Sequence, residues 1–219
     1  MANLFESPRF IAVEGPLRVG KSSLAAILAD HLRARRITEP ENNPFLDRFY
    51  QAQPGMAFAT QMWFLKERHA QLSEIQWGER TDLSTPIVSD YLFEKDKLFA
   101  YLNLSDAELD LYRHYYQMLR ESVPTPDLVV YLQATPDVLR QRLRRKGVPG
   151  ERTISDAYIQ KVVEAYDHFF FHYSASDLLV VNTSEIDFVK SDRDLQTLLK
   201  RLGEPVQGMQ FFLPLHAQR

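Results

Sequence analysis

The chain alternates short runs of strand type with longer segments in which apolar residues recur at helical spacing. Five runs have the length and composition of strands, at 10–13, 36–38, 87–89, 128–132 and 178–181. Strands that alternate with helical patterns predict a parallel sheet with helices on both faces. The pattern therefore predicts a three-layer α/β fold built on a five-stranded parallel sheet.

Two polar residues interrupt the apolar side of the helical pattern at 57–77. They are Gln61 and Arg68, among Phe58, Met62 and Leu65. A buried amide must find partners for both its donor and its acceptor. The edge of a nucleobase offers such a pair, and a glutamine satisfied within the core is the alternative.

Composition limits the classes of protein that the chain can represent. Its 219 residues, 45% of them hydrophobic, suffice for a single domain over 1–219, and cysteine is absent. The net charge of −3 gives no basic field, so we expect no nucleic-acid partner. No apolar run is long enough for a bilayer and the first residues do not resemble a secretory signal, so we expect a cytoplasmic protein without membrane contact.

A glycine-rich loop connects the first predicted strand to the first predicted helix. The loop fits the phosphate-binding pattern G-x-x-x-x-G-K-[ST] with Gly15, Pro16, Leu17, Arg18, Val19, Gly20, Lys21, Ser22 and Ser23. Its backbone N–H groups and the positive end of the helix dipole favour bound phosphate. The pattern predicts ATP as phosphate donor, with Lys21 on the β- and γ-phosphates and the Ser22 hydroxyl on Mg²⁺.

Carboxylates follow the second and third predicted strands at the edge where a parallel sheet binds ligands. Glu39 follows one strand, and Pro40 favours an extended conformation for it. Near phosphate, such a carboxylate is a candidate general base, and a solvated loop acid is the alternative. Asp90 ends the next strand and is a candidate Mg²⁺ ligand opposite Ser22.

An arginine-rich helix pattern at 135–146 precedes a Gly-Val-Pro-Gly turn. It holds Arg140, Arg142, Arg144, Arg145 and Lys146. We interpret 140–152 as a lid whose guanidinium groups neutralise a transferring phosphoryl group, and a solvated basic face is the alternative. The C-terminal tail, about 204–219, packs on the body or on a second subunit.

These residues, in this order, resemble the deoxynucleoside kinase family from about residue 10 to about residue 200. Glu39-Pro40 is similar to the family's E-P pair, and Phe58 with Gln61 to its F-x-x-Q. The resemblance implies ATP-dependent phosphorylation of a deoxynucleoside 5′-hydroxyl in nucleotide salvage by a P-loop transferase. It also implies a homodimer formed through helices, with 106–120 as a candidate surface.

The resemblance assigns roles residue by residue. Glu39 accepts the proton, while Lys21, Mg²⁺, Arg142 and Arg144 stabilise the phosphoryl group. The deoxynucleoside is bound by Glu39, Tyr50, Gln61, Arg68, Asp96, Phe99 and Glu151. Phe99 matches a stacking aromatic of the family with a shift of one residue.

One segment departs from the family. The family has a D-R-S or E-R-S stretch, whose Arg touches phosphate and the catalytic Glu. The corresponding stretch of this chain is Ser89-Asp90-Tyr91. In one alignment Asp90 replaces the acid and Tyr91 the Arg; in the other Ser89 replaces the acid and Asp90 the Arg. We prefer the first, because it keeps a strand-end acid for Mg²⁺. The Arg is missing in both, and a lid arginine is the candidate substitute.

Two other functions are compatible with a phosphate loop. A thymidylate-type nucleoside monophosphate kinase should carry an Arg for the acceptor phosphate, often in a D-R motif that this chain lacks. A non-catalytic nucleotide-dependent switch or partner-binding module is the second alternative. Asn182-Thr183-Ser184-Glu185 is not the N-K-x-D segment of guanine readers.

Overall fold

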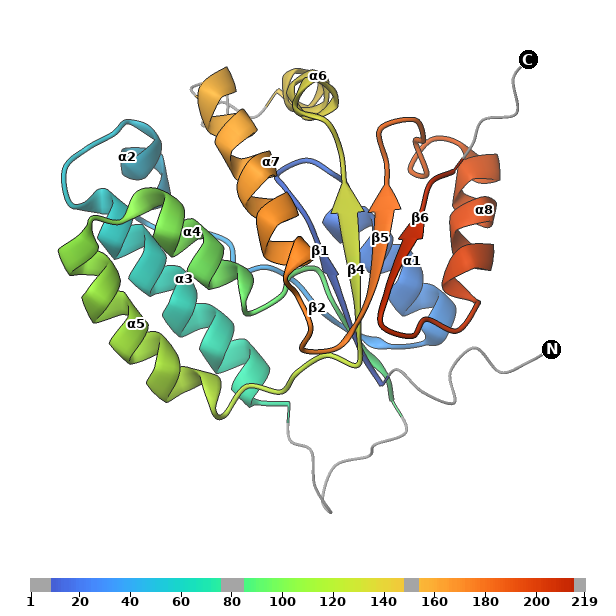
Figure 1. Ribbon diagram of the computed structural model, residues 1–219, viewed down its shortest axis with the longest axis horizontal. Coiled ribbons are helices and arrows are strands. Elements are labelled where there is room, and N and C mark those ends of the chain that lie inside the picture. Colours follow the sequence, from blue (N-terminus) through green and yellow to red (C-terminus); the bar gives the residue numbers. More distant parts are fainter. Residues whose placement is uncertain (1–8, 76–84, 148–153, 215–219) are drawn as a thin grey trace.

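A single six-stranded parallel sheet forms the centre of the molecule (Figure 1). The computed structural model describes residues 9–75, 85–147 and 154–214. The strands lie in the order β2-β3-β1-β4-β5-β6, and every pair is parallel. They are β1 (Phe10–Glu14), β2 (Arg35–Ile37), β3 (Ile87–Ser89), β4 (Leu128–Gln133), β5 (Asp177–Asn182) and β6 (Met209–Phe212).

Helices connect the strands. They are α1 (Lys21–Leu32), α2 (Leu46–Tyr50), α3 (Met56–Ser73), α4 (Lys95–Asn103), α5 (Asp106–Arg120), α6 (Pro136–Lys146), α7 (Asp156–Phe171) and α8 (Asp192–Leu202). None of the helices within the described ranges has the length and apolar character that a membrane crossing requires.

The central strands are buried on both faces, as expected for a parallel sheet between helices. Along β4, Val129 and Tyr131 pack in the cluster that includes α7, whereas Val130 and Leu132 pack in the cluster of α1 and α8. A further apolar cluster joins α3, α4 and α5. Figure 1 shows these helices side by side at one flank of the sheet. The predicted three-layer α/β fold is confirmed.

The sheet has one strand more than the five predicted. The tail supplies β6, whose register pairs Val180 with Phe211 of the tail. This edge strand has only four residues, and the side chains of Met209 and Phe211 are exposed. A short edge strand lacks the continuous apolar run that identifies a central strand, so its pattern did not separate it from a packed tail.

Candidate active site

The carboxyl ends of β1, β2 and β3 bring three acidic residues to one edge of the sheet. Glu14 ends β1, and Glu39 and Asp90 follow β2 and β3 within two residues. The Glu39 backbone N–H donates to Asp90 Oδ1 at 2.6 Å, and the Asp90 N–H donates to the Ile37 carbonyl at 3.0 Å. These hydrogen bonds hold the segment after β2 against the end of β3.

The glycine-rich loop has the backbone that its sequence requires. Gly15 and Gly20 have φ values of 152° and 115°, which residues other than glycine rarely adopt. A Cβ on Gly15 would lie 2.4 Å from the Leu132 carbonyl oxygen, so the loop passes too close to β4 for any side chain. Lys21 Nζ donates to the Gly15 carbonyl at 2.8 Å and to the Pro16 carbonyl at 3.2 Å. Its ammonium group is therefore held over the cradle where phosphate would bind.

The carboxylate of Glu14 connects this loop to the neighbouring elements. It is fully buried, and its Oε1 accepts from the Gly15 N–H at 2.7 Å and from the Tyr166 hydroxyl at 2.9 Å. Its Oε2 accepts from the Leu92 N–H at 2.8 Å. A buried carboxylate with three such donors is well stabilised, so the start of the loop is fixed relative to α7 and to the segment before α4.

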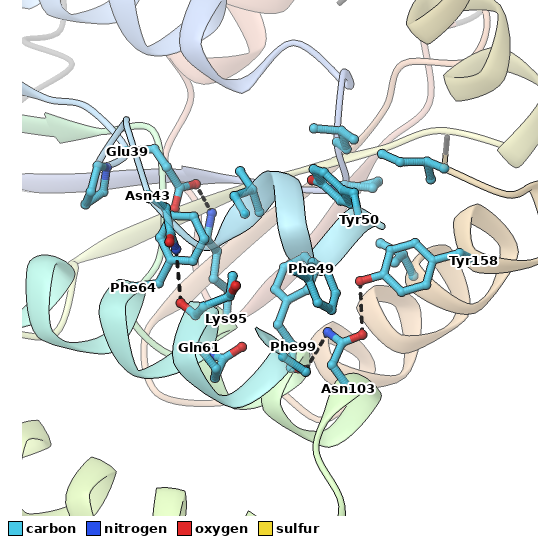
Figure 2. A pocket seen from close by; sticks show the side chains of 18 of the residues that line it. Glu39, Asn43, Phe49, Tyr50, Gln61, Phe64, Lys95, Phe99, Asn103 and Tyr158 are labelled. Carbon is cyan, nitrogen blue, oxygen red and sulfur yellow. Dashed lines mark hydrogen bonds and ion pairs between the residues drawn. The ribbon is translucent and has the colours of Figure 1, made fainter. Parts of the chain in front are cut away.

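A cavity of about 390 Å³ lies next to the loop (Figure 2). Its walls come from the loop, the segment after β2, and helices α2, α3, α4, α6 and α7. Eight of the predicted residues line it, namely Pro16, Leu17, Lys21, Glu39, Tyr50, Gln61, Arg68 and Phe99. The cavity therefore extends from the phosphate loop to the polar residues of α3.

Glu39 is clamped by cations at the end of the cavity near the loop. Arg68 Nε donates to Glu39 Oε1 at 2.9 Å, and Lys95 pairs with Glu39 Oε2. The Glu39 side chain keeps 28% of its surface exposed. Burial alone would raise the pKa of Glu39, but Arg68, Lys95 and Lys21 together lower it to about 2. Glu39 is a carboxylate at neutral pH and can accept a proton.

Gln61 and Arg68 share a buried partner in α4. The Gln61 amide nitrogen donates to the Asp96 carbonyl at 2.9 Å and also to its carboxylate. Arg68 forms an ion pair with Asp96, and the Tyr112 hydroxyl donates to Asp96 Oδ1 at 3.1 Å. Asp96 is fully buried behind Gln61 and Arg68, so it orients both side chains at the cavity wall.

The predicted lid arginines, Arg142 and Arg144, are not among the described residues that line the cavity. Arg142 donates to the Val19 carbonyl at 3.0 Å and to the Thr183 carbonyl at 2.7 Å, so it joins the phosphate loop to the segment after β5. Arg144 is exposed on α6, and Ser22 is exposed in the first turn of α1. Glu151 lies outside the described residues.

The sequence did not single out several residues that shape the cavity. The Tyr158 hydroxyl of α7 donates to Asn103 Oδ1 at 3.2 Å, and Asn103 Nδ2 donates to the Phe99 carbonyl at 2.8 Å (Figure 2). The centre of the Phe64 ring lies 4.6 Å from the Arg68 guanidinium carbon. The least expected is Lys95, a buried lysine in a segment of alternating charges.

Comparison with known proteins agrees with this geometry. A family model described as deoxynucleoside kinase matches residues 11–207. The chain belongs to the deoxynucleoside kinase family. Deoxynucleoside kinases are phosphotransferases, so the predicted enzyme class is confirmed together with the family.

Individual relatives cover nearly the whole chain. A deoxyguanosine kinase of Bacillus subtilis is 30% identical over 89% of this chain and 96% of its own. A deoxyadenosine kinase of Lactobacillus acidophilus is 26% identical over 90% of this chain and 96% of its own. The structure of a deoxyadenosine kinase from M. mycoides with bound dATP, 21% identical, superposes with a TM-score of 0.74 over 89% of this chain and 99% of its own. It has the same fold.

Proposed function

We propose that this deoxynucleoside kinase transfers the γ-phosphoryl group of ATP to the 5′-hydroxyl of its substrate in nucleotide salvage. The observation that carries the proposal is the position of Glu39, on the wall of the cavity that the phosphate loop also lines. Glu39 takes the proton of the 5′-hydroxyl as the 5′-oxygen bonds to the γ-phosphorus. The bond from that phosphorus to the β,γ-bridging oxygen breaks, and ADP leaves.

The low pKa of Glu39 in the free protein is compatible with this role. Lys21 and Lys95 both lower it, and both ammonium groups are close to the place where phosphate would bind. A bound triphosphate adds negative charge beside them and offsets their effect on Glu39. Glu39 therefore becomes a stronger base when the donor is present.

We propose a purine deoxynucleoside as the preferred substrate. Because the Gln61 amide nitrogen already donates to Asp96, Gln61 offers its carbonyl oxygen to an N–H group of the base. Adenine, guanine and cytosine all carry such an N–H group, so the choice of a purine rests on the names of the two relatives, a deoxyguanosine and a deoxyadenosine kinase. Tyr50, Phe99 and Glu151 stay candidates for contacts with the sugar and the base.

Ser22 and Asp90 are the residues proposed to hold Mg²⁺. One follows β1 within the phosphate loop and the other follows β3, the strand that pairs with β1. A hydroxyl and a carboxylate are hard oxygen donors, and Mg²⁺ in phosphate sites needs only one or two protein ligands. The residues fit the ion, which when bound would neutralise charge on the β- and γ-phosphates. The lid roles of Arg142 and Arg144 stay predictions.

The competing activity is phosphorylation of a nucleoside monophosphate. It is disfavoured because an acceptor phosphate at the loop end of the cavity would meet the Glu39 carboxylate. A coupled ADP assay with ATP and Mg²⁺ separates the two. We expect turnover with deoxyguanosine or deoxyadenosine and background rates with dGMP, dAMP and dTMP. Turnover with a monophosphate alone would contradict the proposal.

The homodimer and the cytoplasmic location stay predictions from the sequence, and the outer face of α5 supports the first. Leu111, Tyr115 and Met118 are exposed there at spacings of four and three residues, which places them on one helical face. We expect twice the chain mass of 25.5 kDa in light scattering for the wild type and a monomer for Met118→Asp. The control is Val189→Asp, which changes an exposed apolar residue outside α5, and this variant should stay dimeric. A monomeric wild type would contradict the dimer.

A further inference from the structure

Lys95 is a buried cation that the sequence analysis assigned to no role. It lies in the first turn of α4 with 4% of its side chain exposed. Its ammonium group pairs with Glu39 Oε2 (Figure 2). It also lies 3.7 Å from Glu14 Oε2. A lysine is rarely buried to this extent unless its charge is paired, so the position calls for a specific explanation.

The two carboxylates around Lys95 belong to the two halves of the site. Glu14 accepts a hydrogen bond from the Gly15 N–H and so contacts the phosphate loop, whereas Glu39 faces the cavity. Lys95 is the cation between them. It therefore connects the donor side of the site to the group proposed to act as base.

Tyr91, four residues before Lys95 and outside α4, donates its hydroxyl hydrogen to a residue other than Glu39 and Glu14. The Tyr91 hydroxyl donates to Gln71 Oε1 at 2.8 Å, which directs the phenol toward α3. Its ring lies beneath Lys95, with the ammonium nitrogen 5.8 Å from the ring centre. Arg142, the candidate substitute from the lid, donates to the carbonyls of Val19 and Thr183 instead.

We propose that Lys95 is the positioning residue that fixes Glu39 relative to the phosphate loop. This inference rests on the proposed function of Glu39 as general base. Arg68 holds Oε1 of the carboxylate and Lys95 holds Oε2, so both cations are needed to set its orientation. Displacement of a reacting group by about 1 Å can lower a rate 10²-fold.

The groups around Glu39 hold its two carboxylate oxygens separately. Arg68 reaches Oε1 from α3 and Lys95 reaches Oε2 from α4, while the Asp90 carboxylate binds the Glu39 N–H and Glu14 lies beyond Lys95. Removing Lys95 leaves Oε1 paired and Oε2 without its cation, so the carboxylate is no longer held at both oxygens.

The test compares Lys95→Met, Lys95→Arg and a matched control, Lys97→Met. Lys97 lies on the same helix with its ammonium group 5.1 Å from the centre of the Tyr116 ring. We expect Lys95→Met to lower kcat about 100-fold with a much smaller change in KM. Lys95→Arg should recover part of the rate, and Lys97→Met should match the wild type.

Two results would overturn the role of Lys95 while leaving the proposed function intact. One is an unchanged kcat in a folded Lys95→Met variant. The other is a lower kcat accompanied by an equally large rise in KM, because a defect spread over the whole site would weaken nucleoside binding as well. Wild-type protein that forms no nucleoside monophosphate would instead contradict the proposed function.

Discussion

Glu39→Gln is expected to lower kcat for deoxynucleoside phosphorylation by about 10²–10⁴, the range for a lost general base. An amide keeps the shape of the carboxylate but cannot accept the 5′-hydroxyl proton. The nucleoside should still bind, because Gln61, Phe99 and the other cavity walls are unchanged. Steady-state kinetics with a purine deoxynucleoside would measure both effects.

The control for this variant is Asp47→Asn, which removes a negative charge from an exposed position of α2. It should keep the wild-type kcat. Thermal unfolding of both variants would reveal any loss of stability from leaving Arg68 and Lys95 without a carboxylate partner. A folded Glu39→Gln variant with normal turnover would remove Glu39 from the role of base.

Lys21→Met should lower kcat by about 10²–10³ and raise the KM for ATP. The loop carbonyls of Gly15 and Pro16 hold the ammonium group over the phosphate cradle, so its charge is in place before the donor binds. Removing one such preorganised donor typically costs this factor. Burial and the nearby Lys95 lower the pKa of Lys21, and bound phosphate would relieve this effect.

Lys66→Met is the matched control, because Lys66 is exposed on α3 and pairs with Glu67. Initial rates over a range of ATP concentrations should be those of the wild type for Lys66→Met and greatly reduced for Lys21→Met. Equal ATP dependence in the two variants would be inconsistent with a phosphate site in the glycine-rich loop.

The sequence predicted the features of this protein that depend on local patterns. Apolar runs identified the four central strands, β1, β3, β4 and β5, because buried parallel strands need such runs on both faces. The phosphate loop was recognised because its glycines have a conformation that few other residues adopt. Gln61 and Arg68 were noticed because they are polar on an apolar helix face, and both line the cavity.

The features that the sequence missed depend on tertiary contacts. The segment Glu94-Lys95-Asp96-Lys97 has the composition of a solvated surface, yet its first three residues are buried among charges from β1, the segment after β2, α3 and α5. The role of Arg142 at the phosphoryl group stays a prediction, but its hydrogen bonds to the backbone carbonyls of Val19 and Thr183 were not expected. Neither placement follows from spacing along the chain.

The central claim is that a carboxylate next to the phosphate loop activates a sugar hydroxyl. The most direct measurement incubates the purified protein with Mg²⁺, a purine deoxynucleoside and ATP labelled in its γ-phosphate, and locates the label by mass spectrometry and phosphorus NMR. The account predicts a deoxynucleoside 5′-monophosphate that carries the label, formed in equal amount with ADP. Label found only in inorganic phosphate, or on another oxygen of the sugar, would contradict it.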